Sequence, residues 1–271
     1  PKNILIISLT RMGDLIQTTP LIRGLRQKYL GAKITLMVSS DFKSVISLIP
    51  DIDNSVVINL RKFKKSDEWE DKSWVKIYRY LESELNNLRN KSFDLVVNLS
   101  HSRLSALMVY YLKVNNIIGF HCNSSGDRMT GHPWMQYFGI EPFNREFNEF
   151  NLVEIFSRSA GIDLAKKEIE VVEQKVDILN TELQIENLMK SNDQLTIGFQ
   201  IGSSLENRRW STKSFAILAN LLIRKLNARV LLFGVQSESN SAKEMMDLLN
   251  DKSKVTDLTG KTDLKQLSVL L

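Results

Sequence analysis

A single aspartate near the start of the chain has the surroundings of a general base. The segment ISLTRMGDLIQTTP (7–20) runs from an apolar stretch into a short polar loop that holds Gly13 and Asp14. The loop lacks the repeated glycines and the lysine of phosphate-binding loops, and a carboxylate there would repel a pyrophosphate. Asp14 can instead accept the proton of a hydroxyl that attacks an electrophile. The alternative role for Asp14 is that of a helix N-cap.

Four further residues are candidates beside Asp14. Gly13 would let the backbone turn tightly and come close to a ligand. Thr18 and Thr19 could hydrogen-bond a ligand or cap the helix that follows them. His101 comes after a later strand and could contact an acceptor, with a solvated or structural role as the alternative.

A second polar stretch, QIGSSLENRRW (200–210), offers hydrogen-bond donors and positive charge. A helix is expected to begin at about Ser211, and backbone N–H groups at a helix start bind phosphates, as do the forked donors of arginine. The stretch therefore predicts a diphosphate site whose candidate residues are Ser203, Ser204, Arg208 and Arg209. The alternative is a solvated loop with Trp210 packed beneath it.

Glu238 follows the next expected strand and could hold the hydroxyl pair of a ribose or begin a helix. The second half of the chain thus offers a site for an anionic, nucleotide-linked leaving group, whereas the first half offers a base. Together they suit transfer of a group from an activated donor to a hydroxyl acceptor, across a cleft between two domains.

The elements that must position these residues alternate along the chain. Short continuous apolar runs predict buried parallel strands, and the segments between them predict helices, which is typical of a doubly wound α/β sheet. Thr19 is the expected N-cap of a helix that starts at Pro20. The segment 121–146, rich in glycine, proline and histidine, predicts a long loop or irregular insertion. Strands are expected at 3–9, 32–39, 55–60, 93–99 and 114–120, and helices at 20–30, 102–112 and 149–162.

Two domains are expected. The first spans 1–162, and the charged segment 163–193 is the predicted inter-domain connection. The second, 194–271, repeats the alternation and stops inside its last helix, so we expect it to be incomplete. Its strands are expected at 195–201, 228–234 and 255–260, and its helices at 211–226, 238–250 and 263–271.

Composition and charge narrow the classes of function. The chain has 271 residues, a net charge of +5 and one cysteine. One cysteine excludes an internal disulfide framework, and no apolar run reaches the roughly 20 residues of a membrane span, so we expect a cytosolic protein. The modest positive excess favours an anionic partner such as a nucleotide, an acidic glycan or a lipid surface. No basic helix or stacking platform points to nucleic acid.

Two short basic segments, 61–65 and 72–79, have aromatic residues among or close to them. They predict either a solvated surface or a patch that contacts a membrane surface or a glycolipid. No metal site is predicted. The pair Asp51 and Asp53 has the Asp-x-Asp spacing of a metal motif, but its position after the segment SVISLIP and before an expected strand favours a turn. The spacing of Cys122 and the histidines fits no zinc pattern.

Six segments of the chain, in order, resemble those of one enzyme family. They are ILIISLTRMGDLIQTTPLIRGLR, FDLVVNLSHSRLSALMVYYLKVNNIIGF, NLVEIFSRSAGI, IGFQIGSSLENRRWSTKSFAILANLL, ARVLLFGVQSE and VTDLTGKTDLKQLSVLL. They are similar to segments of the heptosyltransferases, the glycosyltransferase family 9 enzymes of lipopolysaccharide core synthesis. The resemblance covers most of the chain, and the first and fourth segments together are its most specific part.

The resemblance implies a GT-B fold, with two Rossmann-like domains facing a cleft. It implies inverting transfer of a heptose from ADP-heptose to a hydroxyl of the lipopolysaccharide inner core, without a metal or a cofactor. The implied partners are the ADP-sugar donor and an anionic core acceptor. The implied location is peripheral, at the cytoplasmic face of the inner membrane.

Residue roles follow from the same resemblance. Asp14 matches the general base, and Glu238 matches the acidic residue that holds the ribose. Ser203 and Ser204 match hydroxyl residues near the donor phosphates. Arg208, with Arg209 beside it, falls where the family often has a lysine that neutralises the diphosphate.

Two departures from the family pattern affect the donor. The chain ends at Leu271, before the next donor-site loop of the family, and "RRWS" stands where "KRWP" is commoner. Two other hypotheses therefore stay open. One is a transferase of the same fold that uses a different nucleotide-sugar, and the other is a nucleotide- or glycan-binding protein without catalysis.

Overall fold

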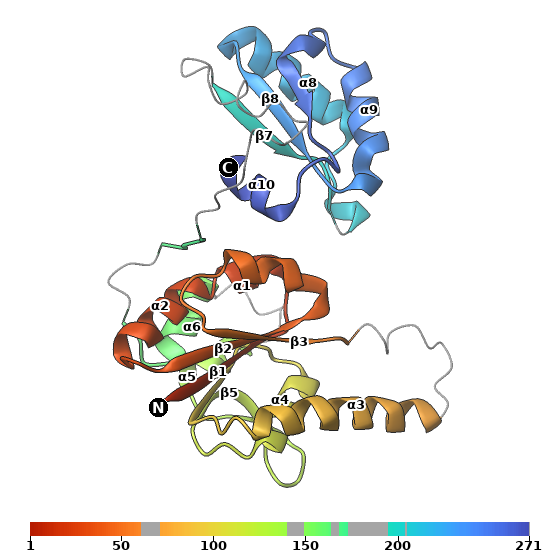
Figure 1. The fold of residues 1–271 in the computed structure, drawn as a ribbon. Coiled ribbons are helices and arrows are strands. Elements are labelled where there is room, and N and C mark those ends of the chain that lie inside the picture. Colours follow the sequence, from red (N-terminus) through yellow and green to blue (C-terminus); the bar gives the residue numbers. More distant parts are fainter. Residues whose placement is uncertain (61–70, 140–148, 164–167, 173–194, 204, 271) are drawn as a thin grey trace. The chain divides into compact units, whose positions relative to one another are not determined.

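The computed structural model describes residues 1–60, 71–139, 149–163, 168–172, 195–203 and 205–270. The chain forms two compact units, Pro1–Val172 and Glu173–Leu271, each with a largely parallel sheet and helices (Figure 1). The expected α/β class is therefore confirmed. None of the described helices combines the length and the apolar composition that a membrane span requires.

The first unit holds a six-stranded sheet. In spatial order its strands are β3 (Asn54–Ile58), β2 (Lys33–Ser39), β1 (Asn3–Ser8), β4 (Leu95–Asn98), β5 (Ile117–Cys122) and β6 (Arg128–Thr130). The strands from β3 to β5 are parallel, and β6 pairs antiparallel with β5. The first five are the strands that the apolar runs predict.

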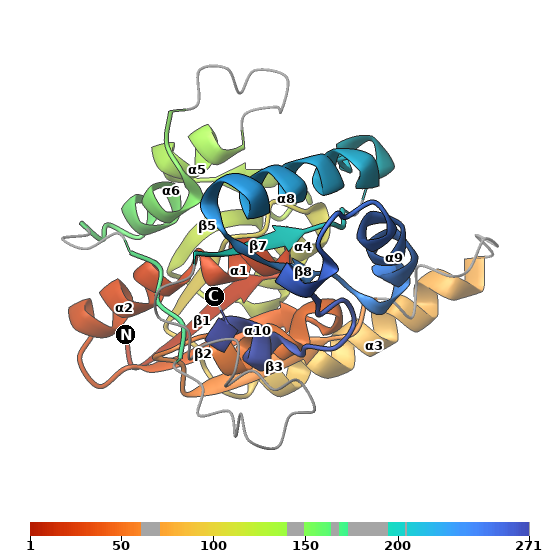
Figure 2. The ribbon, with the colours of Figure 1, turned by 90° about the horizontal axis from the view of Figure 1, so that it is seen from above.

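Helices cover both faces of this sheet. α1 (Met12–Ile16) and α2 (Thr19–Lys28) lie on one face, and α3 (Asp71–Arg89) and α4 (Arg103–Leu112) lie on the other (Figures 1 and 2). Because the sheet is covered on both faces, its central strands are apolar along most of their length. The short 3₁₀ helix η1 (Ser40–Leu48) follows β2.

The core of the first unit joins the sheet to α3 and α4. Leu5 and Val96 of the sheet contribute to one buried cluster with Leu88 of α3 and with Met108 and Val109 of α4. Burial of such side chains stabilises the fold by roughly 1.5–3 kcal/mol each. This packing fixes the strands whose carboxyl ends carry the candidate site.

The described part of the segment 121–146, residues 121–139, is more regular than its composition predicts. Its start belongs to β5, which turns into β6 through a tight hairpin. The Asn123 N–H donates to the carbonyl of Asp127 (3.0 Å), and Gly126 takes a φ of +81°, which favours glycine. The prediction of an irregular insertion is therefore wrong here, because the turn residues form a specific hairpin.

Two helices of the first unit were also missed. α5 (Pro133–Phe138) begins where His132 Nδ1 accepts the N–H of Trp134 (3.3 Å), with Pro133 in the first turn. α1 occupies the stretch after β1 that was expected to be a loop. Both helices are short, so apolar periodicity does not reveal them.

The expected helix at 149–162 is present as α6 (Leu152–Ser159), and it packs against α2. A Cβ added at Gly24 of α2 would lie 2.3 Å from Ile162 Cγ2, so only glycine permits this approach. Lys28 Nζ donates to the carbonyls of Ala160 and Gly161 at the end of α6 (3.2 and 3.1 Å). The contact fixes α6 beside the helix that follows α1.

Residues 168–172 lie on the first unit. The Glu170 N–H donates to Thr19 Oγ1 (3.1 Å), and the Glu170 carboxylate pairs with Arg23. The Val172 N–H donates to the carbonyl of Leu48 (2.9 Å). The rest of the predicted connection, apart from Asp163, lies outside the described residues.

The second unit holds a three-stranded parallel sheet of β7 (Thr196–Gln200), β8 (Arg229–Phe233) and β9 (Val255–Asp257). The helices α8 (Thr212–Leu226) and α9 (Ser239–Asp247) share a buried cluster with β7, β8 and β9. Leu267 and Leu270 of α10 (Leu264–Leu270) pack against a second cluster on the sheet. The strands and helices predicted in this half are confirmed.

Candidate functional site

The candidate site of the first unit lies where the strand order reverses. β1 and β4 are neighbours, but the chain leaves β1 towards β2 on one side and leaves β4 towards β5 on the other. The loops after the two strands therefore diverge. In open α/β sheets a ligand binds at this point, beyond the carboxyl ends of the strands.

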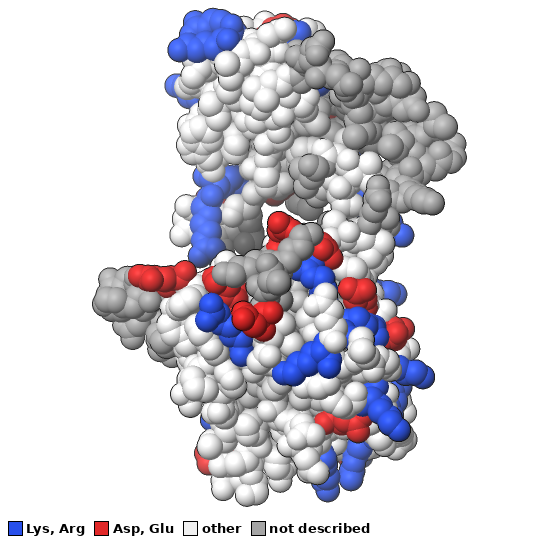
Figure 3. All heavy atoms as spheres, turned by 90° about the vertical axis from the view of Figure 1, so that its left-hand side faces the viewer, with Lys and Arg blue, Asp and Glu red and all other residues white. Residues whose placement is uncertain are grey.

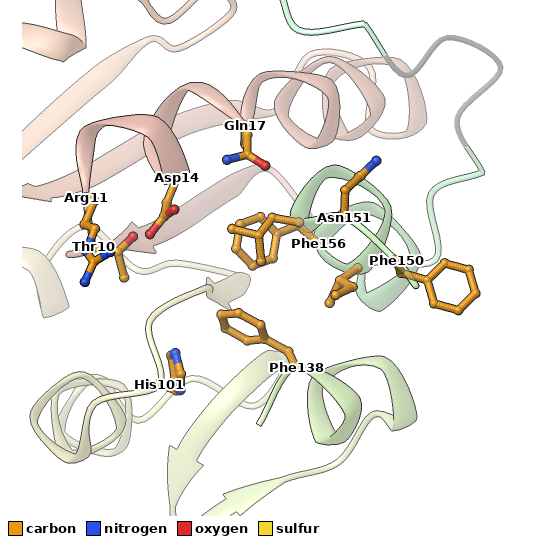
Figure 4. A pocket seen from close by; sticks show the side chains of 11 residues that line it. Thr10, Arg11, Asp14, Gln17, His101, Phe138, Phe150, Asn151 and Phe156 are labelled. Carbon is orange, nitrogen blue, oxygen red and sulfur yellow. The ribbon is translucent and has the colours of Figure 1, made fainter. Parts of the chain in front are cut away.

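A pocket of about 660 Å³ opens at this point (Figure 4). Residues after β1, after β4 and from α5 and α6 line it, so segments far apart in the sequence meet there. One part of its lining is polar and another is aromatic. The lining residues are Thr10, Arg11, Asp14, Gln17, His101, Phe138, Phe150, Asn151, Leu152, Ile155 and Phe156.

Asp14 is part of the pocket lining and lies in the first turn of α1. Arg11, not Asp14, is the N-cap residue, so the structural alternative for Asp14 is wrong. The side chain is partly exposed, and no described residue forms a hydrogen bond or an ion pair with its carboxylate. Figure 4 shows the carboxylate pointing into the pocket. Its lone pairs are therefore available to a ligand, as a general base requires.

Gly13 does not provide the expected tight turn. It is an ordinary residue of α1 and is not among the described glycines with positive φ. No atom lies within 4 Å of a Cβ added there, so the surrounding space is open. The open space is compatible with a ligand, but the backbone of Gly13 needs no special conformation.

Thr18 and Thr19 do not face the pocket. Their relative exposures are 0% and 1%, and their hydroxyls donate to the carbonyls of Leu15 (2.6 Å) and Ile16 (2.9 Å). Neither side chain caps α2, whose N-cap residue is Thr18 rather than the expected Thr19. The expected ligand contact is therefore wrong for both threonines, because burial and local hydrogen bonds occupy their hydroxyls, whereas Thr18 does occupy the N-cap position, without a side-chain cap hydrogen bond.

His101 lies on the opposite wall of the pocket from Asp14 (Figure 4). Its ring packs on Phe138, with ring centroids 4.5 Å apart, and stacks on Phe120 at 5.9 Å. Arg128 Nη1 donates to the His101 carbonyl (2.7 Å), so the β5–β6 hairpin helps to hold the residue. The structure thus brings His101 and Asp14 to the same pocket.

A buried hydrogen-bond network fixes the loop that carries His101. Asn98 Nδ2 donates to the carbonyl of Phe120 (2.7 Å), and Asn98 Oδ1 accepts the N–H of Ser100 (3.1 Å). Ser100 Oγ accepts the N–H of Leu9 (2.7 Å), which lies just before the pocket residues of the first loop. One hydroxyl therefore ties the loop after β4 to the loop after β1.

The loop after β7 holds the candidates of the second unit. Ser203 is partly exposed, and its carbonyl accepts a hydrogen bond from Arg209 Nη2 (3.2 Å). Arg208 is exposed and ends the 3₁₀ turn η5 (Glu206–Arg208). The structure brings Ser203 and Arg209 together, and Arg208 stays in the same loop; Ser204 lies outside the described residues.

Two features of this loop bear on the alternatives. Ser211 Oγ accepts the N–H of Ser214 (3.0 Å), so α8 begins as predicted and its first N–H groups follow the loop. Trp210 packs against Phe215 with ring centroids 5.0 Å apart, yet half of its surface is exposed. Trp210 is therefore a neighbour of the loop and not a buried support beneath it.

Glu238 lies against the same loop from the end of β8. A Cβ added at Gly202 would lie 1.6 Å from Glu238 Oε1, and one at Gly234 would lie 2.6 Å from Oε2. Oε2 accepts the N–H of Val235 (2.8 Å), closing the short turn η6 (Gln236–Glu238) before α9. The helix-start role is therefore present, and no described residue donates to Oε1.

Comparison of the sequence with models of known protein families shows which family the chain belongs to. The sequence model of glycosyltransferase family 9 (heptosyltransferase) matches residues 83–271, which is more than half of the chain. The chain belongs to glycosyltransferase family 9.

Known relatives of this glycosyltransferase agree with that assignment. It is 25% identical over 286 residues to lipopolysaccharide heptosyltransferase 1 of Campylobacter coli, covering 98% of this chain and 74% of that protein. A family 9 glycosyl transferase from Veillonella parvula has a similar structure, with a TM-score of 0.70 and 18% identity over 99% of this chain and 72% of that one.

Two Escherichia coli structures share the fold. ADP-heptose lps heptosyltransferase II matches with a TM-score of 0.63 and 20% identity, covering 99% of this chain and 76% of that one. Heptosyltransferase WaaC with ADP-2-deoxy-2-fluoro heptose matches with a TM-score of 0.63 and 17% identity, covering 98% of this chain and 78% of that one. At these identities the likeness shows the GT-B type of fold.

Several residues that line the pocket of the glycosyltransferase were not predicted from its sequence. Arg11 and Gln17 lie three positions before and after Asp14 in the sequence, and this spacing could have predicted that they share its pocket. Asn151 could have been found as the cap of α6, because its Oδ1 accepts the N–H of Glu154 (3.0 Å). No sequence pattern singled out Phe138 or Phe156, which reach the pocket only through the tertiary packing of α5 and α6.

Charged residues of both signs are mixed on one face of the first unit. On the face in Figure 3, Lys and Arg of the first unit lie among Asp and Glu. The basic segment 61–65 lies outside the described residues, and 72–79 belongs to α3. Within the described part of the chain, no three His, Cys, Asp or Glu residues are grouped as metal ligands would be.

Proposed function

We propose that this glycosyltransferase transfers a heptose from ADP-heptose to a hydroxyl of the lipopolysaccharide inner core. Membership of family 9 supports a glycosyltransferase, and the names of the related proteins support the heptose and the acceptor. The observation that carries the proposal is Asp14, whose carboxylate points into a pocket and has no described partner.

In the proposed mechanism, the acceptor binds in the pocket of the first unit. Asp14 takes the proton of the attacking hydroxyl while its oxygen bonds to the anomeric carbon of the heptose. The bond from that carbon to the ADP oxygen breaks, and ADP leaves with the electron pair. A single displacement of this kind inverts the configuration at the anomeric carbon.

The second unit is proposed to bind the donor. Negative charge grows on the diphosphate as it leaves, and positive groups and hydrogen-bond donors near it lower the barrier. Arg208, Arg209, Ser203 and the first N–H groups of α8 supply such groups, and the proposal assigns the task to them and not to a metal or a cofactor. Glu238 Oε1 is the proposed acceptor of the ribose hydroxyls.

The acceptor would be an anionic lipid-linked glycan, which suits the net charge of +5. Such an acceptor is presented at a membrane surface. We therefore propose a peripheral position at the cytoplasmic face of the inner membrane, with no role for nucleic acid. Sedimentation of the protein with vesicles that contain core lipid, compared with vesicles that lack it, tests this placement.

The test of function is a transfer assay with matched donors. The purified protein is incubated with a heptose-deficient core lipid and with ADP-heptose, ADP-glucose or a UDP-sugar. Product with ADP-heptose alone is the expected result. Product with only another donor would keep the fold but replace the sugar, and donor binding without any product would favour a binding protein.

A further inference from the structure

Arg11 is the arginine that lines the pocket of the first unit, and its guanidinium has no described partner. It is exposed, it lines the pocket, and no described residue accepts a hydrogen bond from its side chain. Arg26 pairs with Asp53 (2.7 Å), and Arg128 binds the carbonyl of His101 (2.7 Å). Both of these arginines stabilise the fold, whereas Arg11 is free to bind a ligand.

The position of Arg11 relative to Asp14 is defined by α1. Arg11 is the N-cap residue, and its carbonyl accepts the N–H of Leu15 (3.1 Å), which fixes the turn that carries Asp14. The Arg11 side chain extends from this turn towards the same pocket as the Asp14 carboxylate (Figure 4). The two side chains do not form an ion pair with each other among the described contacts.

We propose that Arg11 selects the acceptor by binding an acidic substituent beside the hydroxyl that Asp14 activates. A guanidinium binds a carboxylate or a phosphate through two parallel hydrogen bonds, so it fixes orientation as well as charge. The acceptor is then a sugar whose reacting hydroxyl lies close to an acidic group. This inference rests on the proposed function.

The rest of the pocket suits such an acceptor. Phe138, Phe150 and Phe156 give the lining an aromatic part, onto which the apolar face of a sugar ring can pack. Arg11 and Asp14 give it a cation and a carboxylate in one turn of helix. A neutral sugar would leave the guanidinium unpaired, whereas an acidic one would pair with it.

The test compares three acceptors with four proteins. The acceptors are a detergent-solubilised heptose-deficient core lipid, its carboxyl-reduced form and its dephosphorylated form. The proteins are wild type, Arg11→Gln, Arg11→Lys and the control Arg89→Gln. Arg89 is an exposed arginine at the end of α3, away from this pocket and without a described partner, so its substitution makes the same change in net charge.

Dissociation constants from calorimetry and initial rates of transfer are both measured. Arg11→Gln should weaken binding of the unmodified lipid by about 10- to 100-fold, the range of a hydrogen bond to a charged group. For the lipid that lacks the acidic group bound by Arg11, the same substitution should change the dissociation constant by less than about twofold. The arm that loses the effect identifies the acid as a carboxylate or a phosphate. Arg11→Lys should keep part of the affinity, and Arg89→Gln should match wild type.

Other outcomes overturn the inference. The inference is contradicted if Arg11→Gln loses affinity equally for all three lipids, or loses affinity for none of them. It is also contradicted if wild type fails to bind the core lipid. Selective binding without transfer would contradict the proposed function but not the role of Arg11. Transfer by wild type with no acceptor selectivity at Arg11 would contradict the inference alone.

Discussion

Asp14 and Glu238 are the two candidate carboxylates of this chain, and their surroundings are alike. Each is a carboxylate at the carboxyl edge of a sheet, and each keeps at least one oxygen without a described partner. Buried polar groups of the fold, such as Asn98 and Ser100, by contrast form hydrogen bonds within the first unit. A free carboxylate oxygen beside a pocket or a polar loop is therefore what the two candidates share.

The first prediction concerns the base. Asp14→Asn keeps the shape of the side chain but cannot accept the proton, so kcat should fall by about 10²- to 10⁴-fold. The affinity for the donor should stay within about twofold of wild type, because the donor is proposed to bind the other unit. Steady-state kinetics and donor titration measure the two quantities. Asp163→Asn, an exposed carboxylate of the same unit, is the control; full activity of Asp14→Asn would refute the assignment.

The second prediction concerns the donor site. In Gly202→Ala the new Cβ would occupy the space of the Glu238 carboxylate, so that flexible side chain must move away. The donor should then bind at least about tenfold more weakly, because a hydrogen bond to a charged group is lost. Isothermal titration with ADP measures the change. Gly131→Ala, where nothing lies within 4 Å, should bind ADP like wild type, and unchanged binding by Gly202→Ala would exclude Glu238 as a donor contact.

The sequence pointed to Asp14 and Glu238 because each lies in the short segment after an apolar strand. The structure places Asp14 in the pocket lining and Glu238 against the loop after β7, and their chemical roles stay predictions. Sequence reasoning failed at Thr18 and Thr19, because burial and contact with a distant segment are not visible in local sequence. Phe138 was missed because its approach to His101 depends on the packing of α5.

At the scale of elements, the strands of both sheets were predictable and the short elements between them were not. A buried parallel strand needs a continuous apolar run, which is visible in sequence. α1, α5 and β6 are each a few residues long and depend on caps, turns or a partner strand for their stability. The hairpin at Gly126 could have been predicted from its turn-forming residues, whereas the sequence analysis expected a long loop or irregular insertion there.

The third prediction tests the contact between α2 and α6. Alanine usually stabilises a helix relative to glycine, but Gly24→Ala would place a Cβ against Ile162. We expect the free energy of unfolding to fall by about 1–3 kcal/mol. Ile162→Ala removes the opposing atoms, so adding Gly24→Ala to it should cost less than it costs alone. Urea unfolding of the four proteins measures this coupling, and additive effects would contradict it.

At the scale of the whole molecule, two ordinary sheets provide two sets of candidate residues. The first sheet places Asp14, Arg11 and His101 at its switch point, and the second places its loop and Glu238 at the ends of β7 and β8. The order of the elements along the chain was sufficient to predict this arrangement within each unit.

The fourth prediction concerns acid stability. Burial raises the pKa of Asp53, but the Ile34 N–H and the Arg26 guanidinium lower it by more, so it lies below 3.8. The N–H groups of Asn3 and Lys2 likewise lower the pKa of Asp94 below 3.8. A lowered pKa contributes stability above the unfolded value that is lost as pH falls through the folded value. The free energy of unfolding should therefore drop below about pH 4.

Urea unfolding at a series of pH values measures this loss. Asp53→Asn removes one of these titrating groups and also breaks the pair with Arg26. The variant should be less stable than wild type at neutral pH, and the difference between the two should shrink in acid. A constant difference at every pH would show that the charge of Asp53 does not contribute.

The described lining of the pocket in which we propose that the acceptor binds comes from one unit only, between Thr10 and Phe156. Acceptor preference should therefore be portable. A chimera that joins the first unit of this transferase to the second unit of a relative should inherit its acceptor from the former and its nucleotide-sugar from the latter. The chain would then be a pair of interchangeable modules, from which new glycan linkages can be assembled by recombination.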